Sequence, residues 1–432
     1  MKKLINKISK NKIVYIFLIF IIIMFPNAFY TKSEYQQRAI LISVALDKNE
    51  EGYSINGMLV VPSSAGNISS NVELVDGKGG SVADALHSIE TDLGKKVSLA
   101  HCDTIFVNSE ILQEDLSKVL DYFIRGVHGT KNSIIIAVDG QAKDLLNYIK
   151  SSNKVNNFLA SDLVNSENNL IGLTNVSLKE FYKDYFTPGE ISVMSLLKME
   201  DEQSTGQSSG GSSEGGSSSG ASGGSSGESG GGGESQSGGS SGGQSKKTLR
   251  SENELLILKQ GKQVAKLTNE SSDFYNLIND QAKIDFLFLN DLNIEDDNGA
   301  ITKSLGINIV EKSINKKYNI KNGIPILNYD IEIVVRLTEV IQEGNVTEES
   351  INAVKTHVND PVKHAIIDYY KKGLKQIMSL SQNNKVDIFR FKEKLNKFHN
   401  KKWKEYYENL QDKNDYLNNF EVNFNLVIKP KF

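Results

Sequence analysis

Short apolar runs alternate with amphipathic runs over the first third of the chain. Residues 38–47 and 53–61 are rich in aliphatic side chains, and the polar stretch 48–52 between them predicts a β-hairpin. A helix is expected over 81–89, which begins with a serine that can cap the first turn. The elements that follow alternate in type, with strands expected at 97–107 and 133–138 and helices at 112–124 and 142–149. This alternation predicts a layered domain of helices and strands over residues 35–150.

The pattern changes beyond residue 300, where longer runs alternate between apolar and polar positions. Strands are expected at 305–314 and 327–341, each with one buried side and one side facing solvent. Helices are expected from Thr347, at 362–380, at 389–398 and at 403–410, with a break or kink at Asp360-Pro361. A closing strand is expected with a core face formed by Val422, Phe424, Leu426 and Ile428. Residues 301–432 are therefore expected to form an antiparallel sheet with helices on one side.

A tract of glycine and serine interrupts the chain at residues 204–245. Glycine loses the most backbone entropy on ordering and serine has little surface to bury, so the tract is expected to be disordered. Strand patterns flank it, at 190–199 and, as a pair turning at Gln260-Gly261, at 254–267. Because the cost of closing a loop grows slowly with its length, we favour an elongated loop inside one middle domain, 151–300, over a linker between domains.

The N-terminal residues combine a lysine-rich head with an apolar run. Residues 13–25 contain no charged side chain, a pattern typical of a segment that directs the following chain across a membrane while the lysines stay in the cytoplasm. The apolar core has the length of a signal peptide, whereas 13–30 at about 1.5 Å per residue nearly spans a bilayer of roughly 30 Å. Pro26 weakens the best cleavage site, after Ala28, so retention as an anchor is favoured over removal. Residues 1–34 are accordingly expected to be a cytoplasmic head followed by an anchor or signal.

Composition narrows the class of protein. The formal net charge of −4 indicates no general affinity for nucleic acid. The one cysteine, Cys102, excludes an intramolecular disulfide and a cysteine-based zinc site. The roughly 400 residues beyond the N-terminal segment exceed what one core organises. The expected fold is therefore α+β and multi-domain, with mixed or antiparallel sheets and helices behind an N-terminal membrane segment.

Reactive side chains form no pattern typical of an active site. His101 and Cys102 are adjacent, but neighbours on a strand point to opposite faces, so a buried structural cysteine is favoured over an activated nucleophile. His357 and His364 can share a helical face, but Pro361 lies between them and no third ligand is near, so packed or solvated histidines are favoured. No catalytic, cofactor-binding or metal-binding residue and no cofactor is therefore predicted.

Two further segments allow more than one interpretation. Lys401–Tyr407 combines lysines and aromatic side chains that could contact lipid headgroups or a partner, although a helix anchored in the core by Trp403 is favoured. Gly77–Gly80 precedes a helix but lacks the lysine and the spacing of a phosphate-binding loop, so a simple turn is favoured.

Several of these segments resemble the Ger(x)C family of spore germination proteins. The residues that carry the resemblance are Asp47 at the end of the first strand, the hairpin end Val60-Val61-Pro62, Gly80–Ala85, Lys95–His101, Leu120–Arg125, and Val386–Phe391 followed by Trp403 and Tyr406. The resemblance covers roughly residues 35–200 and 252–432 and leaves the glycine and serine tract unmatched.

The resemblance implies a non-catalytic, membrane-attached C subunit of a nutrient germinant receptor. Its partners would be the membrane and polytopic receptor subunits, and its location the extracytoplasmic face of the spore inner membrane; the small-molecule ligand stays undefined. Members of the family usually carry a lipidated cysteine after the signal, whereas residues 23–35 contain none, so a retained helix would have to provide the attachment. Residues 126–129 also depart from the family pattern. The alternative hypothesis is an anchored extracytoplasmic ligand-binding protein or hydrolase unrelated to germination.

Overall fold

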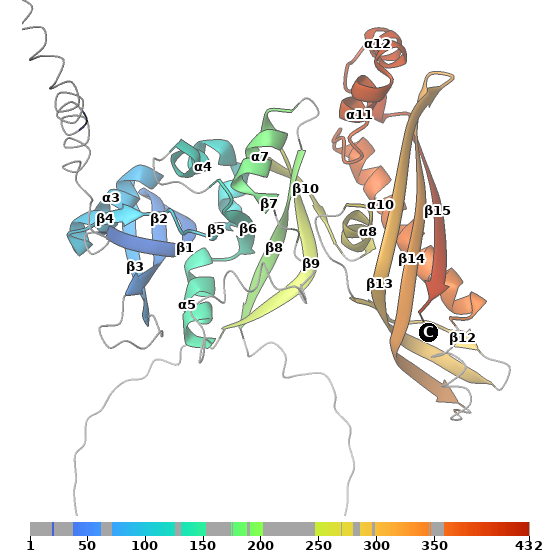
Figure 1. Ribbon diagram of the computed structural model, residues 1–432, viewed down its shortest axis with the longest axis horizontal. Coiled ribbons are helices and arrows are strands. Elements are labelled where there is room, and N and C mark those ends of the chain that lie inside the picture. The colour runs from blue at the N-terminus through green and yellow to red at the C-terminus, as the bar shows by residue number, and fades with distance from the viewer. Residues whose placement is uncertain are drawn as a thin grey trace, which may run out of the picture.

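A computed structural model of the chain describes two units, each built on its own β-sheet (Figure 1). The described residues are 20, 38–61, 71–125, 131–152, 174, 176–187, 191–201, 247–268, 270–279, 286–295, 299–344, 346 and 358–431. The fold is α+β, as the sequence predicts. The expected N-terminal segment lies outside the described residues apart from Phe20, and no helix in the described ranges is long and apolar enough to cross a membrane.

The first unit is a ten-stranded mixed sheet with the main strand order β10-β9-β8-β6-β5-β1-β2-β3. Its strands are β1 (Arg38–Asn49), β2 (Gly52–Val61), β3 (Asn71–Gly79), β4 (Lys96–Ser98), β5 (Thr104–Asn108), β6 (Ile134–Asp139), β7 (Val176–Ser177), β8 (Ile191–Asp201), β9 (Lys247–Lys259) and β10 (Lys262–Leu267). Its helices are α3 (Val82–Leu93), the 3₁₀ helix η2 (Ser109–Gln113), α4 (Leu116–Arg125), α5 (Ala142–Ser152) and α7 (Leu178–Tyr185). The predicted β1–β2 hairpin and the serine cap of α3, at Ser81, are both present.

Two expected elements of this unit differ in the structure. The strand expected at 97–107 is two strands, because β4 pairs with the start of β1 and β5 with its second half, and a turn connects them. The helix expected from residue 112 begins at Leu116 instead. Asp115 accepts a hydrogen bond from the Ser117 backbone N–H at 3.1 Å, which satisfies a donor of the first turn.

Strands on both sides of residue 150 share the first sheet, which differs from the expected division into domains 35–150 and 151–300. The β8 strand pairs in parallel with β6, and β9 and β10 extend the same sheet. Both β8 and β9 bury residues on their two faces, as central strands do, so they require neighbours on either side.

The glycine and serine tract connects neighbouring strands. Asp201 at the end of β8 pairs with Lys247 at the start of β9, which is the placement that the flanking patterns predict. The predicted turn at Gln260-Gly261 joins β9 to β10, and both residues have positive φ angles, of 51° and 74°. The expected disorder of residues 204–245 concerns positions outside the described ranges.

The second unit is a five-stranded sheet with α-helices on one side. Its elements are α8 (Glu270–Ile278), β11 (Phe286–Leu289), β12 (Ile294–Glu295), β13 (Ala300–Lys321), β14 (Ile324–Gly344), α10 (Asp360–Asn383), α11 (Phe391–Phe398), α12 (Asn400–Glu408), the 3₁₀ helix η4 (Asp415–Leu417) and β15 (Glu421–Pro430). The β13 and β14 strands form the expected long antiparallel hairpin, but β15 runs parallel to β14, so the expectation of an antiparallel sheet is wrong at this edge. The chain between them crosses over through α10, α11 and α12, which allows the parallel return.

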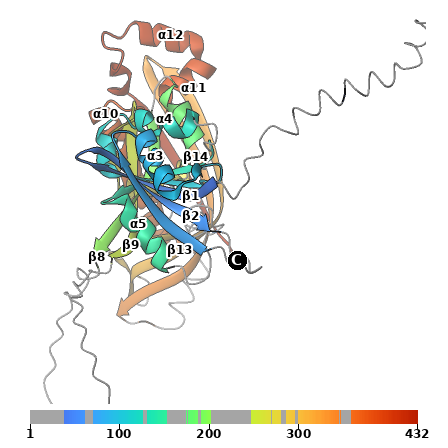
Figure 2. The same cartoon turned by 90° about the vertical axis from the view of Figure 1, so that its left-hand side faces the viewer.

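The helical region of the second unit starts at Asp360. Asn359 accepts a hydrogen bond from the Val362 N–H at 3.1 Å, and Pro361 occupies the first turn, where its missing N–H costs nothing. Asp360-Pro361 therefore begins α10 and does not kink it; the helix expected from Thr347 falls outside the described residues. In both views of the molecule α11 and α12 project at one end (Figures 1 and 2).

One hydrophobic core joins the two units. Ile191 and Val193 of β8 and Leu255 and Ile257 of β9 belong to the same buried cluster as the side chains of α8, α10 and β13–β15. The opposite face of the same strands packs on the α4 and α7 side, through residues such as Met194. The position of the second unit is therefore set by burial of apolar surface against the first.

Candidate functional site

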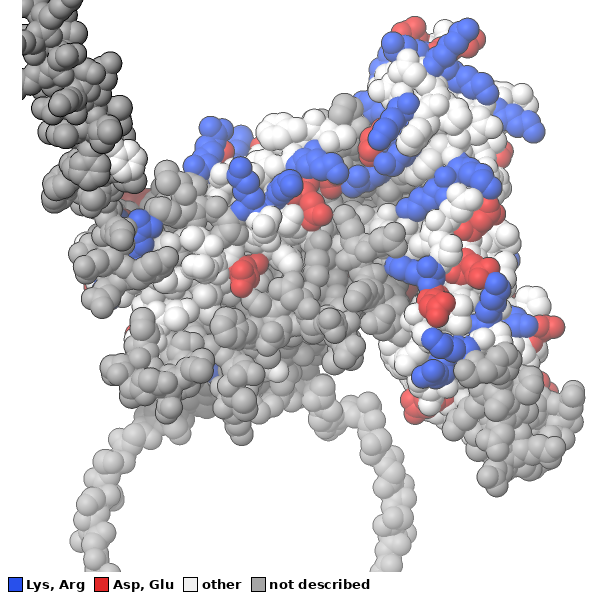
Figure 3. Space-filling model, in the orientation of Figure 1, with Lys and Arg blue, Asp and Glu red and all other residues white. Residues whose placement is uncertain are grey.

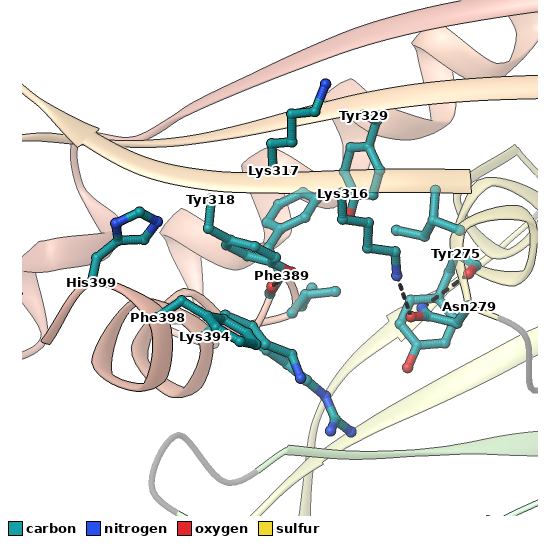
Figure 4. Close-up of a pocket in the computed structure, with 13 residues that line it drawn as sticks. Tyr275, Asn279, Lys316, Lys317, Tyr318, Tyr329, Phe389, Lys394, Phe398 and His399 are labelled. Carbon is teal, nitrogen blue, oxygen red and sulfur yellow. Dashed lines mark hydrogen bonds between the residues drawn. The ribbon is translucent and has the colours of Figure 1, made fainter.

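A cleft with a volume of about 640 Å³ opens between the end of α8, the strands β13 and β14, and α11 with the loop before it (Figure 4). The residues that line it are Tyr275, Ile278, Asn279, Lys316, Lys317, Tyr318, Tyr329, Ile388, Phe389, Arg390, Lys394, Phe398 and His399. These residues are aromatic, aliphatic or basic, apart from one asparagine, and include no aspartate or glutamate. The chemistry of the lining favours groups that are anionic or aromatic.

Ile388, Phe389 and Arg390 of the lining belong to the segment Val386–Phe391, which carries part of the resemblance to the Ger(x)C family. Asp387 is buried, and its carboxylate accepts hydrogen bonds from the backbone N–H groups of Phe391 at 2.9 Å and Lys392 at 2.8 Å. The Tyr416 hydroxyl donates a third, at 3.1 Å. Burial raises the pKa of Asp387, and these hydrogen bonds oppose the shift. Asp387 therefore replaces the missing side-chain cap of α11 and holds its first turn in place.

Arg390 connects the cleft to the first unit. It has a left-handed φ of 56° at the start of α11, and its Nη2 donates to both carboxylate oxygens of Asp184, on α7, at 3.1 Å each. Its Nη1 lies 3.5 Å from Glu393. Burial raises the pKa of Asp184, while the charge of Arg390 opposes that shift. This ion pair ties the loop before α11 to a helix about 200 residues earlier in the chain.

The tyrosines of the cleft have structural roles. The Tyr318 hydroxyl donates to the Phe389 carbonyl oxygen at 2.9 Å. Burial raises the pKa of Tyr275 to about 12, and burial also raises the pKa values of Tyr318 and Tyr329. All three phenols therefore stay neutral at physiological pH, so they are poor acids and poor nucleophiles.

The lysines of β13 lie at the rim of the cleft. Lys316 places its Nζ 3.4 Å from Asn279 Oδ1 and 5.7 Å from the centre of the Tyr329 ring. Lys317 points to the other face of the strand and pairs with Asp330 at 3.2 Å. Lys394, on α11, pairs with Glu393 at 3.1 Å. The cleft thus combines a basic rim with an aromatic interior.

Of the reactive side chains considered in the sequence, Cys102, His101 and His364 lie away from this cleft. Cys102 is buried, burial raises its thiol pKa to about 12, and His101 beside it is exposed. Both lie between β4 and β5, and not on a strand as expected. His364 is exposed on α10, and His357 lies outside the described residues. No group of three or more His, Cys, Asp or Glu side chains in the described ranges has an arrangement that could hold a metal ion.

Trp403 and the glycines near α3 are structural. Trp403 is buried and stacks on Tyr407, with ring centres 5.1 Å apart, so the favoured interpretation as a core anchor is confirmed. Gly77 lies within β3 and not in a turn as expected. A Cβ on Gly77 would lie 2.3 Å from the Ala85 carbonyl oxygen, so its absence lets α3 pack on the strand.

Asp47, another aspartate of the family-like segments, has the same role in the first unit. Its buried carboxylate accepts hydrogen bonds from the backbone N–H groups of Ala142 at 2.7 Å and Lys143 at 3.0 Å. These two N–H groups belong to the first turn of α5. Asp47 and Asp387 therefore each cap a helix, one from the end of β1 and one from the loop before α11.

The sequence alone did not indicate the cleft. Asp184 and Arg390 are 206 positions apart, and neither residue carries a local signal that it has a partner. The lysines of β13 fall on an ordinary alternating strand. The one usable signal was the run Val386–Phe391, because an aspartate between apolar residues is unusual in a core segment.

Comparisons with known proteins support the resemblance to the Ger(x)C family. Residues 31–199 match a family model described as the spore germination protein N-terminal domain, and residues 253–429 match one described as spore germination B3/GerAC-like, C-terminal. The crystal structure of the GerBC protein is similar at 13% identity, with a TM-score of 0.48, and the match covers 90% of this chain and 97% of that chain. No match was found among curated proteins. The two family models span both units, and the chain therefore belongs to the Ger(x)C, or GerAC-like, family of spore germination proteins.

Proposed function

We propose that this chain is the membrane-tethered, non-catalytic C subunit of a nutrient germinant receptor, held beside polytopic receptor subunits on the extracytoplasmic face of the spore inner membrane. The observation that carries the proposal is the match of two spore germination family models to residues 31–199 and 253–429. The lysine-rich head and the apolar run at 13–25 support the tether.

The chemistry of the cleft supports a role through surfaces. Its titratable groups with shifted pKa values are neutral tyrosines and Arg390, whose guanidinium is engaged by Asp184. The described residues that line the cleft include no serine, threonine, cysteine, aspartate or glutamate. The anchored hydrolase, which remains the alternative, would require a side-chain nucleophile beside a general base.

Removal of the tether tests the proposal. A variant that lacks residues 13–25 and carries a cleavable signal should be released from spore membranes and should respond weakly to nutrients, because tethering maintains a high effective concentration beside the partners. The matched control replaces 13–25 with an unrelated apolar helix of equal length, which should restore attachment and response. A released variant that responds fully contradicts the tether.

Histidine substitutions test the non-catalytic role. His101→Gln and His364→Gln should leave the nutrient response unchanged, because both side chains are exposed and lie outside the cleft. Far-ultraviolet circular dichroism checks that each variant folds. Loss of the response in a folded variant would favour the hydrolase.

A further inference from the structure

A group of lysines lies at the end formed by α11 and α12. Residues 391–408, which form these two helices, contain six lysines and three glutamates, a formal charge of +3, in a chain whose net charge is −4. In Figure 3 blue side chains project from this end of the molecule. This end is therefore an exception to the overall charge balance.

Four of these lysines have no acidic partner among the described residues. Within the described part of the chain, the ammonium groups of Lys397, Lys401, Lys402 and Lys404 form no ion pair, and all four side chains are exposed. By contrast, Lys394 in the cleft pairs with Glu393. A cluster of like charges repels itself, and binding of an anionic surface relieves the repulsion.

An exposed aromatic side chain stands among the lysines. Phe398 ends α11 with 62% of its surface exposed, and the Lys397 Nζ lies 5.4 Å from the centre of its ring. A large apolar ring in water is unfavourable, whereas the boundary between headgroups and acyl chains accepts such rings beside cations.

The surface is held rigid from beneath. Trp403 on the inner side of α12 packs against Tyr406, Tyr407 and Tyr416, with ring centres 5.1 to 5.8 Å apart. Asp387 holds the first turn of α11. The backbone that carries the lysines therefore needs little reorganisation to meet a partner, which lowers that part of the entropic cost of binding.

We propose that the basic end, defined as Lys397, Phe398, Lys401, Lys402 and Lys404, contacts the headgroups of an anionic phospholipid bilayer. Lysine favours this partner over an acidic protein, because lysine is depleted in protein interfaces, where arginine and its planar fork predominate. Lysine clusters are the usual means of attraction to anionic lipid surfaces. The proposal rests on the membrane tether proposed above and adds a second contact that would orient the extracytoplasmic part on the bilayer.

A fluorescent reporter tests the contact in the full-length chain. Asn396→Cys places a thiol on α11 beside the basic end, and Cys102 stays unlabelled because it is buried and burial raises its pKa to about 12. The chain is incorporated into vesicles of phosphatidylcholine, with or without phosphatidylglycerol, that carry a quencher on the headgroups. The control reporter, at Asn425→Cys, lies on the exposed face of β15.

The reporter at position 396 should be quenched with phosphatidylglycerol and not without it, and added salt should reverse the quenching. K397E, K401E and K402E together should abolish it, since each lysine near an anionic surface contributes about fivefold, or about 1 kcal/mol, to the docking equilibrium. The matched control reverses three exposed lysines elsewhere, Lys78, Lys150 and Lys375, and should retain the quenching.

The outcomes separate this inference from the proposed function. Flotation of the vesicles in a density gradient shows whether the chain stays bound to them. A chain that floats with both kinds of vesicle while the reporter at position 396 stays unquenched keeps the tether and overturns the headgroup contact. A chain that floats only with phosphatidylglycerol vesicles contradicts the tether and supports the contact. If the triple reversal removes a co-purifying receptor subunit and leaves the quenching unchanged, the basic end binds a protein and the lipid proposal is wrong.

Discussion

The first sheet is covered on both faces, whereas the second leaves one face to solvent. In the first unit, Val44 and Leu46 belong to the core beneath α3 and α4, while Ile42 and Ala45 belong to the core beneath α5. In the second unit the open face carries polar pairs between strands, such as Lys429 with Glu332 at 2.6 Å and Asn423 with Asn328 at 2.8 Å.

The difference shows how each unit depends on its neighbours. Strands buried on both faces need helices delivered from distant parts of the chain, so the first unit uses capping contacts with large sequence separation, such as Asp47 with Ala142. A strand with one face in solvent is specified by the local alternation of apolar and polar residues. In the second unit, helices α10, α11 and α12 follow β14 directly in the chain. Variants in matched positions of the two units test this contrast.

The largest loss of stability is expected from glycines at close backbone contacts. A Cβ on Gly373 of α10 would lie 2.0 Å from the Glu270 carbonyl oxygen, and one on Gly77 would lie 2.3 Å from that of Ala85. G373A and G77A should each lower the free energy of unfolding by roughly 3 kcal/mol, measured by urea denaturation. G80A is the control, because a Cβ there meets no atom within 4 Å. If G373A or G77A lowers the free energy of unfolding no more than G80A does, the two backbones can separate to make room for the methyl group.

The next largest effect is expected at the two capping aspartates. Asp47→Ala and Asp387→Ala each leave two helix N–H groups without their carboxylate and should cost about 2 kcal/mol. Exposed Asp139→Ala and Asp368→Ala serve as controls. If the two units differ as described, loss of Asp387 should affect mainly α11, while loss of Asp47 should separate α5 from β1. Hydrogen exchange of the two helices distinguishes these results.

The same aspartates predict a dependence on pH. Burial raises both pKa values above the ordinary 3.8, so the folded state binds the proton more tightly than the unfolded chain. The stabilisation that comes from this tighter proton binding is then fully present below pH 3.8 and is lost as the pH rises through the folded-state pKa. The unfolding free energy of the wild type relative to Asp387→Asn should therefore fall with rising pH. A relative stability that rises instead would show that the hydrogen bonds outweigh desolvation.

A smaller effect is expected at the ion pair between the units. Asp184→Asn and Arg390→Gln should show a coupling of about 1 kcal/mol in a double-mutant cycle, since the arginine is partly open to solvent. The exposed pair of Lys317 and Asp330, within one sheet, is the control and should show less. Equal coupling in the two pairs would mean that the contact between the units adds no stability of its own.

The smallest effect is expected from the glycine and serine tract. Its ends meet at the paired residues Asp201 and Lys247, so halving residues 204–245 should raise stability by only about 0.6 kcal/mol. In the control variant, the half that is removed is replaced by another glycine and serine sequence of the same length, so the tract keeps its full length. A large loss of stability on shortening would contradict the role of a loop within one sheet.

Local pattern predicted the elements better than their assembly. The β1–β2 hairpin, the Ser81 cap, the turn at Gln260-Gly261 and the long β13–β14 hairpin all follow from residues close in sequence. The break between β4 and β5 was missed, because it depends on which part of β1 each strand pairs with. The cleft was missed for a similar reason, since its residues come from α8, β13, β14, and α11 with the loop before it.

The sequence by itself determined the α+β class, the place of the tract between strand patterns, and the resemblance to a germination family, because periodicity, turn residues and composition act over short distances. Only the tertiary structure decided that β8 to β10 complete the first sheet, that β15 runs parallel to β14, and that Arg390 meets Asp184. These features depend on contacts between residues far apart in the chain. Burial of apolar surface selects such contacts collectively, and no single segment carries the information.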